Sequence, residues 1–92
     1  MESEEILSKR LDRWEDFSFE VQDHIEGYTV PQYGDWPDDQ MTSFTVEEFK
    51  MNMKRYLNRI GRDARGKENS ILDCRKIAHY ACELCYKLEE PK

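Results

Sequence analysis

The 92-residue sequence has few residues that interrupt helices or form cross-links, with three prolines, four glycines and three cysteines. It also has no continuous apolar run of about 18 residues, the length that a membrane-spanning helix requires. The stretch from Met1 to Glu5 is acidic, whereas a signal peptide begins with basic residues followed by an apolar segment. We therefore expect a cytoplasmic protein that does not contact a membrane.

The scarcity of cysteine and histidine also limits the chemistry that the chain can perform. Cys74, Cys82 and Cys85 fall within one predicted helix, and an odd number without a secretory signal argues against a disulfide framework. The helical span from Cys74 to Cys85 is about 16 Å, so one zinc ion cannot bind every thiol and His79 together. Small core residues are the better interpretation. No nucleophile is paired with a base, and no Gly-x-x-x-x-Gly-Lys phosphate loop is present, so we predict neither catalysis nor a cofactor.

Charge is distributed unevenly along the chain, although the formal net charge is only -6. Residues 1–48 carry 14 acidic and 3 basic side chains, whereas residues 50–67 carry 7 basic and 1 acidic. The basic stretch could contact phosphate at short range, or the chain's own acidic half could neutralise it. Neutralisation is the favoured interpretation.

The first half of the chain predicts two short helices followed by a loop. We expect helices over residues 3–14 and 18–27, the second capped by Ser18 and ended by Gly27, and a loop over residues 28–44. The apolar residues at helical spacing are Ile6, Leu7, Leu11 and Trp14 in the first helix and Val21, Ile25 and Tyr28 in the second.

The predicted loop is long for a compact domain, which is typical of a functional or mobile segment. Tyr33 and Trp36 are expected to anchor it against the rest of the protein, with ligand stacking as the alternative. Its aspartates, Asp35, Asp38 and Asp39, could bind a divalent cation, but they lack the spacing of a calcium loop, and a solvated acidic loop is favoured.

The second half predicts a helical hairpin over residues 45–89. Thr45 and Glu48 form a capping box at the start of its first helix, and Gly61 ends that helix in the left-handed conformation. Asn69 or Ser70 is expected to cap the second helix. The predicted buried residues are Val46, Phe49, Met53, Tyr56, Leu57 and Ile60 in the first helix and Ile71, Cys74, Ala78, Ala81, Cys85 and Leu88 in the second, widened by Ile77 and Leu84.

Two polar stripes run beside these apolar faces. One comprises Arg55, Arg59 and Arg62, and the other comprises Asp73, Lys76 and Tyr80. Antiparallel packing would bring the stripes together and let Asp73 accept a bidentate hydrogen bond from Arg59 or Arg62. The favoured interpretation is a polar zipper that fixes helix register, and the alternative is a phosphate or nucleotide site.

The same residues carry a resemblance to a known family. The motifs are Arg55-Tyr56-Leu57-x-Arg59-x-Gly61-Arg62, Asp73-x-x-Lys76-x-x-x-Tyr80 and Pro31-Gln32-Tyr33. From about Val30 to Leu88 the chain resembles small helical phage-encoded proteins of unknown function, some of which form part of phage nucleotide kinases. The resemblance implies a phage or prophage setting close to nucleotide or nucleic-acid metabolism.

Together these patterns predict one all-α domain over residues 1–92, a small bundle of three to four helices centred on the hairpin. The favoured function is a non-catalytic module that binds a protein partner or a second copy of itself. A nucleotide-binding or nucleotide-processing domain is the alternative, and nucleic-acid binding is third. The candidate ligand-binding residues are Arg55, Arg59, Arg62, Arg65, Lys67, Lys76, Tyr80, Tyr33 and Trp36.

Overall fold

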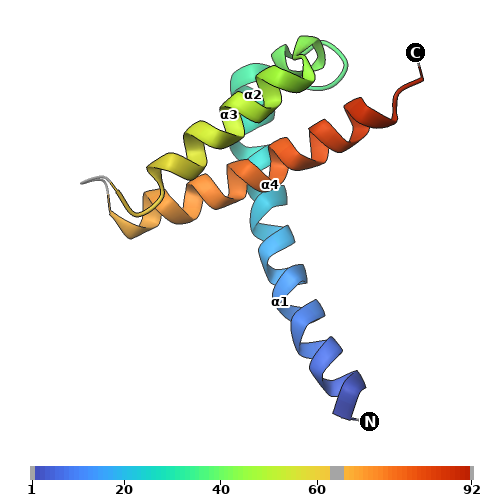
Figure 1. Cartoon of the computed structure of the whole chain (residues 1–92), viewed down its shortest axis with the longest axis vertical. Helices are drawn as coiled ribbons and strands as arrows, with labels where there is room; N and C mark the ends of the chain where they lie inside the picture. Colours follow the sequence, from blue (N-terminus) through green and yellow to red (C-terminus); the bar gives the residue numbers. More distant parts are fainter. Residues whose placement is uncertain (1, 63–65, 92) are drawn as a thin grey trace.

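The computed structural model describes residues 2–62 and 66–91, with side chains from residue 8 onward. The fold is all-α, as predicted, and no strand occurs within the described residues. Its centre is an antiparallel pair formed by α3 (Val46–Arg59) and α4 (Lys67–Glu89), which confirms the helical hairpin (Figure 1).

Local sequence signals determine both ends of α3. The Thr45 hydroxyl accepts a hydrogen bond from the Glu48 backbone amide at 3.1 Å, and the Glu48 carboxylate accepts one from the Thr45 amide at 2.9 Å. This arrangement is the predicted capping box. Gly61 follows the helix with φ of 74°, a conformation that favours glycine. Between these ends, Phe49 and Tyr56 are buried against α4.

The start of α4 differs from the prediction. The helix begins at Lys67 after Gly66, and neither Asn69 nor Ser70 is its N-cap. Instead, the Ser70 hydroxyl accepts a hydrogen bond from the backbone amide of Gly61 at 2.9 Å. A side chain that could have capped its own helix therefore links the end of α3 to the first turns of α4.

The first half of the chain is a single helix, so the predicted division into residues 3–14 and 18–27 is wrong. Helix α1 spans Glu2–His24 without interruption. Ser18 does not cap a new helix, because its hydroxyl donates to the carbonyl of Glu15 at 2.8 Å within the helix. Serine is compatible with such an interior position when it bonds back to the preceding turn.

A π-helical turn over Ile25–Thr29 continues α1 directly into α2 (Val30–Tyr33). The turn is consistent with Pro31, which has no backbone N–H to donate and whose ring, in a regular α-helix, would clash with the carbonyl of Gly27 four residues earlier. The amide of Val30 reaches back to the carbonyl of Ile25, five residues earlier. The predicted loop therefore begins at Gly34, with φ of 95°, and not at residue 28.

The remaining connection is short and partly ordered by aspartate side chains. Asp39 accepts hydrogen bonds from the amide and hydroxyl of Thr42 and so caps the 3₁₀ turn Gln40–Ser43. Asp35 accepts one from the backbone amide of Trp36 at 2.8 Å. These bonds hold two of the predicted loop aspartates in local turns.

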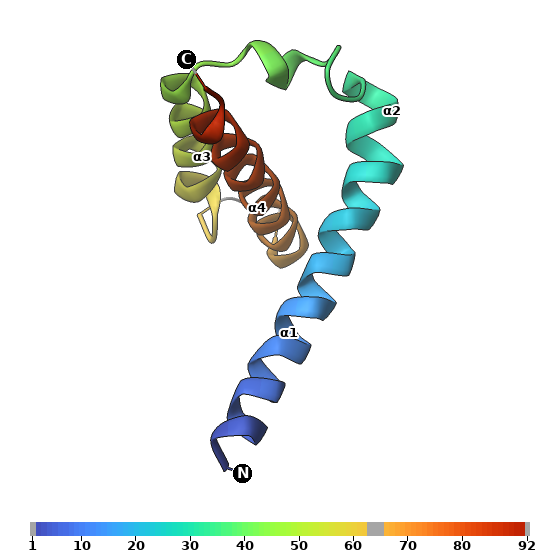
Figure 2. The same cartoon turned by 90° about the vertical axis from the view of Figure 1, so that its right-hand side faces the viewer.

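Helix α1 crosses α4 near the α2 end and then leaves the hairpin, so that its N-terminal half projects away from α3 and α4 (Figures 1 and 2). Glu20 of α1 pairs with Arg75 of α4 at 3.4 Å, close to the crossing. The chain is less compact than predicted, since its radius of gyration is 15.4 Å against about 12 Å for a compact domain of this length.

Several residues predicted to be buried are exposed. Leu57 of α3 is 57% exposed, and Ile71 and Leu88 of α4 are 41% and 64% exposed. On α4, the stripe that also contains Cys74, Ala81 and Cys85 lies at the surface, and the facing side contributes Asp73 instead. Helical periodicity indicated an apolar stripe correctly but did not show which side of α4 meets α3.

Candidate functional site: a basic tyrosine pocket and an uncovered helix face

The ion pair between Arg59 and Asp73 joins the two helices of the hairpin. The Arg59 guanidinium donates to both carboxylate oxygens of Asp73, at 2.8 and 3.4 Å. Asp73 is 1% exposed, so its charge depends on such contacts in place of water. This geometry is the predicted polar zipper. It engages the guanidinium of Arg59 within the fold.

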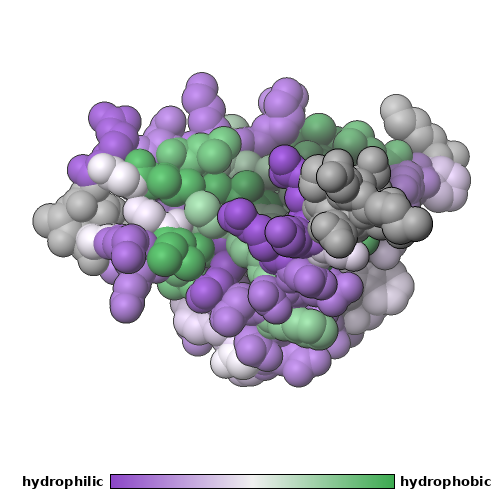
Figure 3. Space-filling model, turned by 90° about the horizontal axis from the view of Figure 1, so that it is seen from below, coloured by the Kyte–Doolittle hydropathy of each residue, from purple (hydrophilic) through white to green (hydrophobic). Residues whose placement is uncertain are grey.

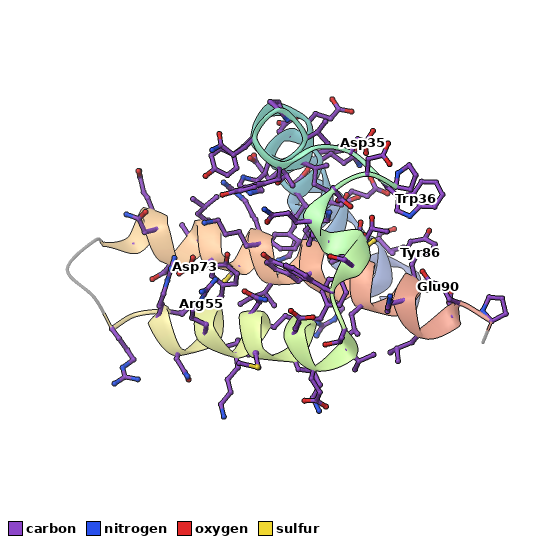
Figure 4. The ribbon with its side chains drawn as sticks, turned by 90° about the horizontal axis from the view of Figure 1, so that it is seen from above. Asp35, Trp36, Arg55, Asp73, Tyr86 and Glu90 are labelled. Carbon is purple, nitrogen blue, oxygen red and sulfur yellow. The ribbon has the colours of Figure 1, made fainter. Side chains whose placement is uncertain are left out.

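Three cations surround the ring of Tyr56. The guanidinium carbons of Arg55 and Arg59 lie 5.3 and 5.1 Å from the ring centroid, and the ammonium of Lys76 lies 5.3 Å from it. Each distance is within the range of cation–π attraction. Figure 4 shows Arg55 and Asp73 on the facing sides of α3 and α4. The seam thus combines positive charge with aromatic surface.

Tyr80 extends the aromatic surface from this seam into the core. Its ring stacks on Tyr56 with centroids 5.6 Å apart and meets Phe49 edge-on at 6.2 Å. Burial, followed by the neighbouring Tyr56 hydroxyl, raises the pKa of Tyr80 far above its usual value. Tyr80 is therefore a neutral phenol at every physiological pH.

A pocket of about 230 Å³ opens above these residues, between the hairpin and the segment that follows α1. Four of the predicted candidate residues line it, namely Arg55, Lys76, Tyr80 and Tyr33. Its wall also contains residues that were not predicted as candidates, chiefly His24, Tyr28, Tyr56 and His79. His24 and Tyr28 lie at the π-helical turn, and such turns are frequent at functional sites.

The electrostatic environment of the pocket is positive. Burial and the nearby Lys76, His79 and Arg75 lower the pKa of His24. The ring of Tyr28 stacks on His24 with centroids 5.2 Å apart and meets Tyr33 edge-on at 6.1 Å, and a hydrogen bond with Tyr28 raises the pKa of Tyr33. Arg55 and Lys76 carry the formal positive charge of the pocket wall, and Asp39 contributes one negative charge.

The other candidate residues lie elsewhere. Arg62 and Lys67 are exposed near the turn of the hairpin, away from the pocket, and Arg65 lies outside the described residues. Trp36 was predicted to anchor the loop by packing against the hairpin, but its side chain is 70% exposed. Figure 4 shows it near Tyr86 on α4, where both side chains line an open hollow of about 430 Å³.

Within residues 2–62 and 66–91, no group of three or more histidine, cysteine, aspartate or glutamate side chains is arranged to hold a metal ion. His79 lies 3.3 Å from Glu83, and the Cys85 thiol donates to Glu89 at 3.7 Å. The alternative that placed His79 among zinc ligands therefore gains no support from the geometry.

A second feature of possible function is the incompletely covered apolar stripe of α1. Because α1 is continuous, the two predicted stripes form one face. Its C-terminal part is partly buried where α1 crosses α4, and the residues concerned are Phe17, Ser18, Val21, His24 and Ile25. Further towards the N-terminus, Leu11 and Trp14 on the same side are 57% and 59% exposed. The apolar stripe of α1 is therefore covered by α4 only in its C-terminal part and is exposed at Leu11 and Trp14.

The outer side of α3 is also apolar in part, but it is basic. Met51 is 69% exposed, and it lines an open groove of about 470 Å³ with Lys54, Arg55, Asn58 and Arg59. Among the described side chains, α1 forms an ion pair with the hairpin through Glu20 and Arg75 of α4. No described acidic side chain of α1 pairs with a basic side chain on this side of α3. Glu47 of the acidic half does pair with Lys50 of the basic stretch at 3.4 Å, so neutralisation is found at Lys50 and stays a prediction for the other basic residues of that stretch.

Two further findings bear on function. None of the described helices combines the length and the apolar character required to cross a bilayer. No protein-family model, curated protein or solved structure matches the chain. The resemblance to small phage-encoded helical proteins stays a prediction.

Proposed function

We propose that this protein is a non-catalytic helical module that associates with a second copy of itself. The observation that carries the proposal is the apolar stripe of α1, which α4 covers only in its C-terminal part. Trp14 and Leu11 continue the covered face into solvent on the half of α1 that projects from the hairpin (Figure 2). Burying such side chains stabilises a protein by about 1.5–3 kcal/mol each.

The amount of exposed surface supports an associated state. The chain exposes 7522 Å², whereas a folded monomer of 11.1 kDa is expected to expose about 5,700 Å². The excess of about 1,800 Å² is larger than the roughly 800 Å² that each partner buries in an interface of standard size. Only Phe49 and Tyr56 are buried hydrophobic residues among those described, so the isolated chain has a small core.

Charge complementarity indicates which surfaces meet. Helix α1 is acidic, whereas the exposed side of α3 carries Lys50, Lys54 and Arg55 around Met51. Two helices of net negative charge would repel each other. Although Lys9, Arg10 and Arg13 lie beside Trp14, the same half of α1 also carries acidic side chains that can pair with the basic side of α3, namely Asp12, Glu15 and Asp16. In the proposed dimer, the N-terminal half of α1 in each copy lies across α3 of the other, so that two equivalent contacts form.

Sedimentation equilibrium of the full chain, from micromolar to near-millimolar concentration, tests the proposal. We expect the mass to rise from 11.1 kDa towards twice that value. Trp14→Glu should give a monomer whose circular dichroism is unchanged. Phe19→Glu is a matched control, since Phe19 is also 59% exposed on α1 but lies on the opposite side from the stripe.

Other outcomes would overturn the proposal. A monomer at every concentration would exclude self-association. A dimer that survives Trp14→Glu but is lost in Ala81→Glu would place the interface on the exposed side of α4 instead. A dimer that does not weaken in Lys54→Glu would contradict the contact with α3.

A further inference from the structure

We propose that the pocket between the hairpin and the segment after α1 binds a small phosphomonoester whose organic part contains a planar ring. The site shares Arg55 with the proposed dimer contact on α3, but Lys76, Tyr80 and the other residues of its wall lie outside that contact, and the proposal does not require the dimer.

The cations of the pocket indicate an anionic ligand. Lys76 and Arg55 come from different helices and lie at equal distance from the Tyr56 ring. Among the described side chains, no carboxylate pairs with either of them. Asp39 also lines the pocket, but its carboxylate already accepts the amide and hydroxyl of Thr42. These hydrogen bonds from neutral donors leave the charge of Asp39 in place, so the wall presents two cations against one carboxylate and positive charge is in excess.

The number of cations favours a phosphate over a carboxylate. A phosphomonoester carries close to two negative charges at neutral pH and has three terminal oxygens. It can therefore accept from the Arg55 fork and the Lys76 ammonium together, whereas a single carboxylate would neutralise only one of them. The neighbouring neutral phenol of Tyr80 and the imidazole of His24 can supply further hydrogen bonds.

The aromatic residues of the pocket favour a ring on the ligand. Tyr28 and Tyr33 are 45% and 48% exposed, so aromatic surface is available at the pocket. A planar ring packs well against such surface in offset or edge-on geometry. The pocket volume of about 230 Å³ is below the 300–1,000 Å³ of most drug-sized sites, which limits the ligand to about one ring beside the phosphate.

Titration of the isotope-labelled full chain with phenyl phosphate, inorganic phosphate and phenol tests this proposal. We expect saturable NMR shifts at His24, Tyr33 and Tyr80 with phenyl phosphate, and at least tenfold weaker binding of inorganic phosphate or phenol. Equal binding of phosphate and phenyl phosphate would overturn the role of the ring. No saturable shift with any of the three would overturn the site.

Variants at one position separate the pocket from general basic charge. Lys76→Met should weaken phenyl phosphate binding by about tenfold or more, and Lys76→Arg should retain most of it. Lys67→Met is the matched control, because it removes the same charge from an exposed residue of the same helix outside the pocket. An equal loss in Lys67→Met would overturn the proposal by showing that the ligand follows overall charge.

The two proposals can fail separately. Trp14→Glu should abolish the dimer without changing the affinity for phenyl phosphate, because Trp14 does not line the pocket. Loss of binding in that variant, with its circular dichroism unchanged, would show that the pocket is complete only in the dimer and would contradict the independence stated above.

Discussion

Replacing Arg59 by methionine should destabilise the protein strongly, because it leaves the buried carboxylate of Asp73 without its guanidinium partner. The two hydrogen bonds measure 2.8 and 3.4 Å, and Asp73 is 1% exposed. Breaking a buried ion pair costs about 3–5 kcal/mol. The Arg59 side chain is 35% exposed and one bond is long, so we expect a smaller loss of about 2–3 kcal/mol.

Thermal and urea unfolding followed by circular dichroism would measure this loss. For a domain of this size, about 2–3 kcal/mol corresponds to a decrease in Tm of roughly 10–20 °C. Because the proposed dimer would make stability depend on concentration, the variants should be compared at several equal concentrations. Arg62→Met is the control, since Arg62 is exposed and its removal should change the free energy of unfolding by no more than about 0.5 kcal/mol.

A double-mutant cycle with Asp73→Asn isolates the pair from other effects of each substitution. We expect a coupling free energy of at least about 1 kcal/mol between positions 59 and 73. A coupling near zero, or a loss in Arg59→Met no larger than that in Arg62→Met, would refute the view that this pair fixes the register of α3 on α4.

Three further predictions concern the core, a helix cap and a titrating group. Phe49→Ala should cost about 3–5 kcal/mol in urea unfolding because Phe49 is 1% exposed, and a loss below about 1 kcal/mol would contradict its place in the core. Thr45→Ala should cost about 1 kcal/mol by removing the acceptor for the Glu48 amide, whereas Thr45→Ser should retain most of the stability. His24, whose pKa is lowered in the fold, should make the free energy of unfolding fall as pH decreases through 6.5, since the unfolded chain then binds the proton more readily. His24→Gln should reduce that pH dependence, and an imidazole NMR titration at or above 6.5 would contradict it.

The sequence predicted best those features that depend on neighbouring residues. Thr45 and Glu48 lie within one turn, so their capping box follows from local geometry and is found in the structure. The pairing of Asp73 with Arg59 was one of the two that were predicted, with Arg62 as the other candidate, because the spacing of charges along two antiparallel helices leaves few registers that join them.

The predictions of helix ends were wrong where a residue type that often caps or ends a helix is also compatible with another position. Ser18 and Ser70 are residue types that cap helices, but one lies inside α1 and the other accepts a bond from Gly61. Gly27 and Pro31 usually mark a helix end, and here a π-helical turn lets the helix continue past both. Local preference cannot decide between these outcomes, since tertiary packing selects one.

The pocket could be predicted only in part, because its walls come from distant segments. Lys76 and Tyr80 were found from their spacing beside Asp73 on one helix. His24 and Tyr28 were missed because their place in the wall depends on how α1 crosses the hairpin, and no periodicity within α1 encodes that crossing. The prediction that the apolar stripe of α4 is buried was wrong for a similar reason. The side of α4 that faces α3 contains the buried carboxylate of Asp73 instead.

The π-helical turn changes the direction in which side chains point along the continuous helical segment, and so it separates the orientation of the α1 stripe from that of the pocket wall formed by Tyr33. Each residue of an α-helix turns the direction of the side chains by about 100°, so one additional residue in the turn reorients everything that follows by about that angle. Helix α1 can therefore present its stripe in one direction while Tyr33, beyond the turn, lines the pocket in another. Deleting Gly27 should convert the segment into a regular helix with the stripe intact and the pocket wall rotated away. A single codon gained or lost would thus reorient the Tyr33 side of the pocket while leaving the exposed part of the α1 stripe, Leu11 and Trp14, unchanged.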